Sequence, residues 1–147
     1  MGFTESVKTC LSQKYVVFQG RASRSEYWWF MLFYLIGLLA LGALALALGL
    51  RSDFMRAGNF NFLALAPVII FMLLMFLPTI SVNVRRLHDR NMSGWWYLGF
   101  ILISNIPYLG LVFALGWFVL MSLKGTEGPN RFGRDPLGSA YAADVFA

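Results

Sequence analysis

Long apolar stretches and short charged clusters alternate along this chain. Three stretches carry no Asp, Glu, Lys or Arg: residues 27–50, 57–84 and 91–123. A helix needs about 20 apolar residues to cross the hydrocarbon core of a bilayer. The first two stretches therefore predict one membrane-spanning helix each, over residues 27–50 and 62–84. Because backbone groups in hydrocarbon must pair within their own segment, the pattern favours an all-α membrane protein.

The third stretch is long for one membrane-spanning helix and short for two. Its middle, residues 104–110, combines polar residues, a proline and a glycine, which is the composition of a chain reversal. Two spans over residues 87–104 and 107–123 would each have about 17 residues, the lower limit for crossing a bilayer. The alternative is one tilted helix that is kinked at Pro107.

The distribution of basic residues favours two spans in this stretch. If the N-terminus lies in the cytoplasm, four spans place ten of the twelve lysine and arginine residues on the cytoplasmic side, and three spans place only seven there. Cytoplasmic loops of membrane proteins are rich in these residues. We therefore predict a bundle of four transmembrane helices with both termini in the cytoplasm, and three helices remain the alternative.

The segments that flank the predicted spans have signals of their own. Residues 3–18 place apolar side chains near helical spacing, which predicts a short N-terminal amphipathic helix in the membrane interface. Ser23 and Glu26 have the spacing of a capping box at the start of the first span. Residues 1–136 are expected to form a single integral membrane domain, and residues 137–147 a flexible tail. Amphipathic rings prefer the interface, where we expect Trp28, Trp29, Trp95 and Trp96.

The overall composition agrees with a membrane protein. Hydrophobic residues make up 59% of the chain and charged residues 13%, whereas soluble domains have roughly 45–50% and 25%. A soluble chain of this length cannot bury so much apolar surface, and a disordered chain would be more polar. The single cysteine, Cys10, excludes an internal disulfide framework and a multi-cysteine zinc site.

Charged and polar residues at the ends of the predicted spans form the candidate functional site. An arginine at the centre of a membrane helix costs about 2.5–3.5 kcal/mol on insertion scales, so these residues are expected to stay at the membrane surface. Arg85 and Asp89 are four residues apart, which allows them to pair on one helix. The predicted cytoplasmic-face polar network comprises Arg21, Ser23, Arg24, Glu26, Arg85, Arg86, His88, Asp89, Asn130, Arg131 and Asp135.

The candidate chemistry of these residues is limited. His88 is the only histidine, so a metal site would lack further ligands, and no nucleophile accompanies it. We therefore expect no catalytic site, no metal and no cofactor. The first two predicted spans hold no ionisable Asp, Glu, Lys, Arg or His, which argues against proton-driven transport. Because the arginines flank apolar spans, anionic lipid headgroups are the expected partner rather than nucleic acid.

Three segments together resemble a known family. Residues 18–28 are similar to its opening motif, residues 85–89 followed by 93–96 to its central motif, and residues 125–136 to its closing motif. The family is that of small bacterial inner-membrane proteins of the YhaH/YhaI type, catalogued as domain of unknown function 805. The resemblance runs from about residue 8 to 136. It implies a multi-pass helical protein of the bacterial inner membrane, and it supplies no reaction or substrate.

The leading hypothesis is a non-enzymatic, multi-pass bacterial inner-membrane protein. Its polar network would be structural, or would bind anionic lipid or a protein partner. The alternative is a small oligomeric transporter or channel component with a pore near Asn83 and a bend at Pro78. Small residues at Ala43 and Ala47 permit close helix contact and leave a homo-oligomer open. A third hypothesis, an enzyme acting on membrane lipid, would require a cleft that joins His88 to the bilayer.

Overall fold

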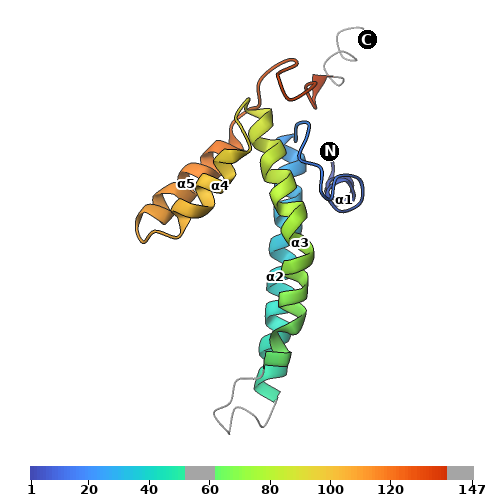
Figure 1. Cartoon of the computed structure of the whole chain (residues 1–147). Helices are drawn as coiled ribbons and strands as arrows, with labels where there is room; N and C mark the ends of the chain where they lie inside the picture. The colour runs from blue at the N-terminus through green and yellow to red at the C-terminus, as the bar shows by residue number, and fades with distance from the viewer. Residues whose placement is uncertain (52–61, 139–147) are drawn as a thin grey trace.

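The computed structural model describes residues 1–51 and 62–138, and the regular elements of these residues are helices (Figure 1). A short α1 and a π-helical turn, η1, precede two long helices and a hairpin of two shorter ones. Their bounds are α1 Phe3–Lys8, η1 Thr9–Gln13, α2 Arg24–Arg51, α3 Phe62–Asp89, α4 Trp95–Ser104 and α5 Leu109–Ser122.

Helices α2 and α3 form a long antiparallel pair (Figure 1). Each has 28 residues, or about 42 Å at 1.5 Å per residue, enough to cross a bilayer. Large apolar side chains point away from the pair, with Leu39 64%, Leu46 70% and Leu73 70% exposed. Such surfaces are stable in hydrocarbon and costly in water, so the prediction of an all-α membrane protein is confirmed.

Both predicted long spans lie within these helices, which extend further at one end. Helix α2 already begins at Arg24, and α3 continues through the charged residues to Asp89. The third predicted span was expected to begin at residue 87, but residues 87–89 belong to the end of α3 and the next helix begins at Trp95. The chain turns after Asp89, where Asn91 has a φ of 58° and the Met92 N–H donates to the Leu87 carbonyl at 3.0 Å. A left-handed residue with such a bond terminates a helix.

The third apolar stretch folds into the antiparallel hairpin of α4 and α5. The predicted reversal near residues 104–110 is present, because the Gly110 N–H donates to the Ile106 carbonyl at 2.7 Å and α5 runs back along α4. The alternative of one kinked helix is therefore wrong. The helices have only 10 and 14 residues, or about 15 and 21 Å, shorter than the two predicted spans. The hairpin diverges from the α2–α3 pair (Figure 1).

The N-terminal segment lies across the α2–α3 pair rather than along it (Figure 1). The predicted helix over 3–18 is present over residues 3–13 as α1 and η1. Its inner side buries Ser6 and Cys10, and Phe3 and Val17 remain 39% exposed. One face of the segment is thus packed on the long helices, whereas its outward face carries Phe3 together with the polar side chains of Glu5 and Lys8.

The N-terminal segment also supplies a hydrogen bond that Pro78 removes from α3. Proline has no N–H, so the carbonyl four residues earlier, that of Leu74, loses its helical partner. The Tyr15 hydroxyl donates to this carbonyl at 2.5 Å. Asn83 is likewise occupied within the protein, because its Nδ2 donates to the Thr79 carbonyl at 2.8 Å and its Oδ1 accepts from the Tyr27 hydroxyl at 3.3 Å.

Two further sequence expectations concern small residues and the tail. Ala45 is buried, whereas Ala43 and Ala47, the pair with spacing for contact between copies, are exposed. Most of the predicted flexible tail, residues 139–147, lies outside the described residues. Of its first two residues, Leu137 donates its N–H to Asp135 Oδ1 at 2.9 Å.

Candidate functional site at the polar end of the bundle

Charged side chains are buried where α2 begins and α3 ends, which we call the polar end. Arg21 is 5% exposed, and Arg85, Arg86, Glu26 and Asp89 are each at most 3% exposed. Removing an ion from water costs several kcal/mol unless an opposite charge and hydrogen bonds replace its hydration. The partners of each buried charge therefore decide whether this end is stable.

Asp89 joins two of the buried arginines. Its Oδ1 accepts a hydrogen bond from Arg21 Nε at 2.9 Å, and its Oδ2 accepts one from Arg86 Nη1. The remaining N–H groups of Arg21 donate to the carbonyls of Thr126 and Gly128. Asp89 and Arg21 together thus connect the loop before α2, the end of α3 and the segment after α5.

Arg86 fixes the end of the hairpin in the same way. Its Nε donates to the Met121 carbonyl at 3.1 Å, its Nη2 to the Leu123 carbonyl, and its Nη1 also reaches the Ala22 carbonyl at 3.3 Å. Arg86 therefore holds the last turn of α5 against α3. Planar guanidinium groups with several fixed donors suit this task better than lysine.

Arg85 faces the other side of α3. It pairs with Glu26, and it donates to Ser81 Oγ at 3.4 Å and to Cys10 Sγ at 3.7 Å. The predicted pair of Arg85 with Asp89 does not form. Successive side chains on a helix are rotated by about 100°, so Arg85 lies toward α2 and η1 while Arg86 reaches Asp89 instead.

Of the two hydrogen bonds that make a capping box, the structure has one between Ser23 and Glu26. The Glu26 N–H donates to Ser23 Oγ at 3.2 Å, as expected for an N-cap. The Glu26 carboxylate does not return to the cap, because Arg85 and the Cys10 thiol occupy its Oε1. Burial, followed by the charge of Glu26, raises the pKa of the Cys10 thiol to about 11.

The segment after α5 folds over the end of α3 and satisfies its terminal carbonyls, which have no helical partner. The Thr126 N–H donates to the Asp89 carbonyl at 2.8 Å, and Asn130 Nδ2 donates to the His88 carbonyl at 2.9 Å. Asp135 shapes the segment by accepting the Gly128 N–H at 3.1 Å. Its carboxylate also lies 4.0 Å from Arg21 Nη2.

His88 is held between the N-terminal loop and this segment. Its Nδ1 lies 3.2 Å from the Gly20 carbonyl, and its ring stacks on Phe132 with centroids 3.9 Å apart. The Arg131 guanidinium lies 4.6 Å from the same Phe132 ring and donates to the Asn91 carbonyl at 3.1 Å. Among the described residues, no three His, Cys, Asp or Glu side chains are grouped as metal ligands.

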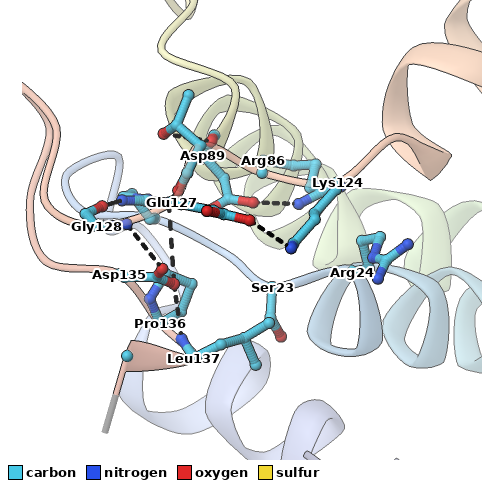
Figure 2. A pocket seen from close by; sticks show the side chains of 14 residues that line it. Ser23, Arg24, Arg86, Asp89, Lys124, Glu127, Gly128, Asp135, Pro136 and Leu137 are labelled. Atoms are coloured by element: carbon cyan, nitrogen blue, oxygen red, sulfur yellow. Dashed lines mark hydrogen bonds and ion pairs between the residues drawn. The ribbon is translucent and has the colours of Figure 1, made fainter. Parts of the chain in front are cut away.

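A cavity of about 480 Å³ opens beside these buried charges (Figure 2). Arg24, at the first turn of α2, lines it and is exposed, and within the described residues it forms no ion pair. Lys124 also lines the cavity, and its Nζ lies 2.6 Å from Glu127 Oε1. That hydrogen bond lowers the pKa of Glu127. Arg24 is therefore a cation that the buried network does not use.

The four predicted interfacial tryptophans do not lie in one place. The ring of Trp28 packs against that of Phe118 in α5, with centroids 4.9 Å apart, and the ring of Trp29 contacts that of Phe3 in α1, with centroids 5.8 Å apart. Trp95 and Trp96, at the start of α4, are 78% and 61% exposed.

Several residues of this site were missed by the sequence analysis. Thr126 and Phe132 contact α3 directly, and a Cβ at Gly125 would lie 2.0 Å from Asp89 Oδ2. Ser81 and Cys10 complete the surroundings of Arg85. The glycines and prolines of residues 125–136 indicated turns, but no pattern in the sequence identified their partners on α3.

The fold and site define an all-α membrane protein whose polar end is closed by buried arginines, two carboxylates and a folded C-terminal segment. The profile of the family described as "Protein of unknown function (DUF805)" matches residues 15–134. The chain belongs to this family, as the resemblance of its three motifs implied.

Curated relatives agree with this assignment. The chain is 40% identical over 127 residues to "Inner membrane protein YhaH" of Escherichia coli (strain K12), covering 84% of this chain and 90% of the relative. It is 35% identical over 124 residues to "Inner membrane protein YhaI" of the same organism, covering 84% and 89%. It is 33% identical over 146 residues to "Uncharacterized protein YiiR", covering 86% and 90%. No solved structure matches the chain.

Proposed function

We propose that this protein is a non-catalytic, multi-pass protein of the bacterial inner membrane whose polar end lies in the cytoplasm. The buried arginine–carboxylate network is structural, and the cavity beside it binds the phosphate of an anionic lipid headgroup. The observation that carries the proposal is the exposed Arg24 at this cavity, next to arginines that are fully occupied by internal partners.

The hydrogen bonds of the site support a structural role for the buried groups. Both oxygens of Asp89 bind guanidinium groups, Glu26 binds Arg85, and the His88 ring is stacked and bonded to a backbone carbonyl. A general base or nucleophile needs a free lone pair that faces a substrate. These side chains instead join segments that are distant in the sequence.

The surroundings of the cavity support phosphate binding. Arg24 and Lys124 both line the cavity, and because Lys124 is paired with Glu127, Arg24 is the cation that faces a phosphate. The N-terminus of the 28-residue helix α2 lies at Arg24, and a helix N-terminus carries roughly half a positive charge. Trp28 and Trp29, two of the tryptophans expected at the membrane interface, follow Arg24 within the first two turns of α2. A phosphate of a membrane lipid is the anion most abundant at that depth.

Replacing Arg24 by glutamine is expected to weaken binding of phosphatidylglycerol about fivefold, because a basic residue near an anionic surface contributes about 1 kcal/mol. Native mass spectrometry of the detergent-solubilised protein, titrated with phosphatidylglycerol and with zwitterionic phosphatidylcholine, measures this. Arg134→Gln is the matched control, since Arg134 is exposed and does not line the cavity. Equal losses for both variants would show that net charge alone, and not this cavity, attracts the lipid.

A reporter enzyme that is active only outside the cytoplasm should remain inactive when fused to the C-terminus at Ala147. The same reporter inserted after Asp53, in the connection between α2 and α3, should be active. The expectation follows from the excess of lysine and arginine at the polar end. An active C-terminal fusion would place the polar end outside and reverse the proposed orientation.

The transporter or channel alternative calls for a polar passage through the membrane. The second cavity, about 410 Å³, lies between α4 and α5 and is lined by apolar side chains and glycines such as Phe100, Gly116 and Trp117. The polar side chain of Asn83, near which a pore was predicted, is bonded to Tyr27 and to the Thr79 carbonyl. These contacts favour the lipid-binding proposal.

A further inference from the structure

The short hairpin of α4 and α5 raises the question of how deep it lies in the bilayer. Residues 91–123 contain no charged side chain, and the hairpin exposes large apolar groups, with Leu102 65%, Leu111 70% and Leu115 62% exposed. Its surface is thus suited to hydrocarbon. Its helices of 10 and 14 residues are about 15 and 21 Å long, against a hydrocarbon thickness of about 30 Å.

The level of the membrane surface can be located on α3. Residues 63–77 include the exposed apolar side chains, whereas none of residues 78–89 is exposed. The twenty residues 62–81 span about 30 Å, the thickness of the hydrocarbon. At Ser81 the N-terminal segment crosses the helix, because Ser81 Oγ donates to the carbonyls of Lys14 at 3.0 Å and Val17 at 2.7 Å. The crossing of the N-terminal segment and the end of the apolar surface of α3 therefore coincide near Ser81.

Both ends of the hairpin are attached to α3 between Ser81 and the polar end. Gly94, just before α4, fits against Val84, since a Cβ at Gly94 would lie 2.8 Å from Val84 Cγ1. The end of α5 is held by Arg86 through the Met121 and Leu123 carbonyls. Val84 and Arg86 are three and five residues beyond Ser81, or about 5 and 8 Å along α3. Even parallel to α3, the two arms would extend only about 10 and 13 Å into the hydrocarbon.

Several polar groups of the turn at the tip of the hairpin are bonded within the hairpin. Ser104 Oγ and Asn105 Nδ2 both donate to the Ile101 carbonyl, at 2.9 and 2.6 Å. The Ile106 N–H donates to the Ile103 carbonyl at 3.0 Å, and the Ile106 carbonyl accepts the Gly110 N–H. Irregular backbone survives at membrane depth only when its hydrogen bonds are made within the protein.

We propose that α4 and α5 form a half-spanning hairpin whose apolar surface binds the acyl chains of one leaflet only, the leaflet at the polar end. Its tip lies in the hydrocarbon of that leaflet and does not reach the opposite leaflet, and the chain crosses the membrane twice, through α2 and α3. The distribution of lysine and arginine that favoured four spans is satisfied equally, because a half-spanning hairpin also returns to its starting side. The hairpin and the N-terminal segment enlarge the protein in that leaflet alone.

Cysteine accessibility tests this depth in sealed vesicles of both orientations, with a membrane-impermeant maleimide. Tyr108→Cys, at the tip, should be protected from both sides. Asp53→Cys and Arg134→Cys should each be labelled from one side, and from opposite sides. The wild-type chain is the blank, because its only cysteine, Cys10, is buried with a pKa of about 11.

Each other outcome overturns the proposal. Labelling of Tyr108→Cys from the Asp53 side would show a hairpin that crosses completely, and labelling from the Arg134 side would show one that lies on the surface. A nitroxide on Ile106→Cys gives a second readout that does not depend on labelling chemistry at Tyr108. Its collision rate with oxygen should be well above the headgroup value, as expected inside the hydrocarbon, whereas a headgroup value would contradict the proposal. The depth of the hairpin is independent of phosphate binding at Arg24, so the two proposals can fail separately.

Discussion

Replacing Asp89 by asparagine is expected to lower the free energy of unfolding by about 3–5 kcal/mol, the usual penalty for removing one partner of a buried ion pair. Asparagine keeps the size of the side chain but removes the charge that neutralises both Arg21 and Arg86, which are almost completely buried. Two guanidinium groups would then remain in a poorly solvated site without a carboxylate. Denaturant-induced unfolding in detergent micelles, followed by tryptophan fluorescence, measures the change.

Glu127→Gln provides the control for this experiment. Glu127 also pairs with a cation, Lys124, but its side chain is 81% exposed and that of Lys124 is 56% exposed. Water already solvates both charges, so this pair contributes little and its loss should leave the unfolding curve nearly unchanged. If Asp89→Asn unfolded at the same denaturant concentration as Glu127→Gln, the buried network would not be what holds the polar end together.

Replacing Gly125 by alanine is expected to destabilise the protein by about 1–3 kcal/mol, the range for overfilling a packed site. The new Cβ would lie 2.0 Å from Asp89 Oδ2 and 2.6 Å from Asp89 Cγ. The carboxylate cannot simply turn away, because Arg21 and Arg86 hold its two oxygens. Either the carboxylate or the segment after α5 must move, and each movement breaks hydrogen bonds.

Gly42→Ala is the matched substitution in a place with space. Gly42 lies inside α2 and has no atom within 4 Å of the position of a new Cβ. Alanine is the better helix former, so this variant should be as stable as the wild type or slightly more stable. The double variant Gly125→Ala with Asp89→Asn should lose less than the two single losses together, since both act on one contact. Simple additivity would show that Gly125 acts through something other than Asp89.

The hydrophobic pattern predicted the long helices well and the third apolar stretch less well. Residues 27–50 and 62–84 had no charges, and both lie within observed helices. The same criterion placed the start of a third span at residue 87, because charged residues at the end of a helix do not show where the helix stops. The turn at Asn91 depends on local hydrogen bonds to Leu87 and His88 that hydropathy does not report.

The candidate site was predicted as a set of segments rather than as contacts. The need to keep arginines out of hydrocarbon brought residues 85–89 and Arg21 to the same end of the bundle, and the structure places them there. The carboxylate with which each arginine pairs depends on how α3 is rotated against α2. Sequence spacing alone gave the wrong partner for Arg85, which pairs with Glu26. The stacking of Phe132 on His88 depends on the path of a whole loop and has no local signal.

The contacts of Arg21 have a consequence for biogenesis. Its guanidinium donates to the carbonyls of Thr126 and Gly128, which come 105 and 107 positions later in the chain. Helices α2 and α3 can enter the membrane during synthesis, before the ribosome has added Thr126 and Gly128. During that interval, Arg21 must stay hydrated at the membrane surface. The polar end can close only after the last turns of the chain emerge, so a prematurely terminated product retains its membrane helices but presents unpaired arginines to the proteases that survey nascent membrane proteins.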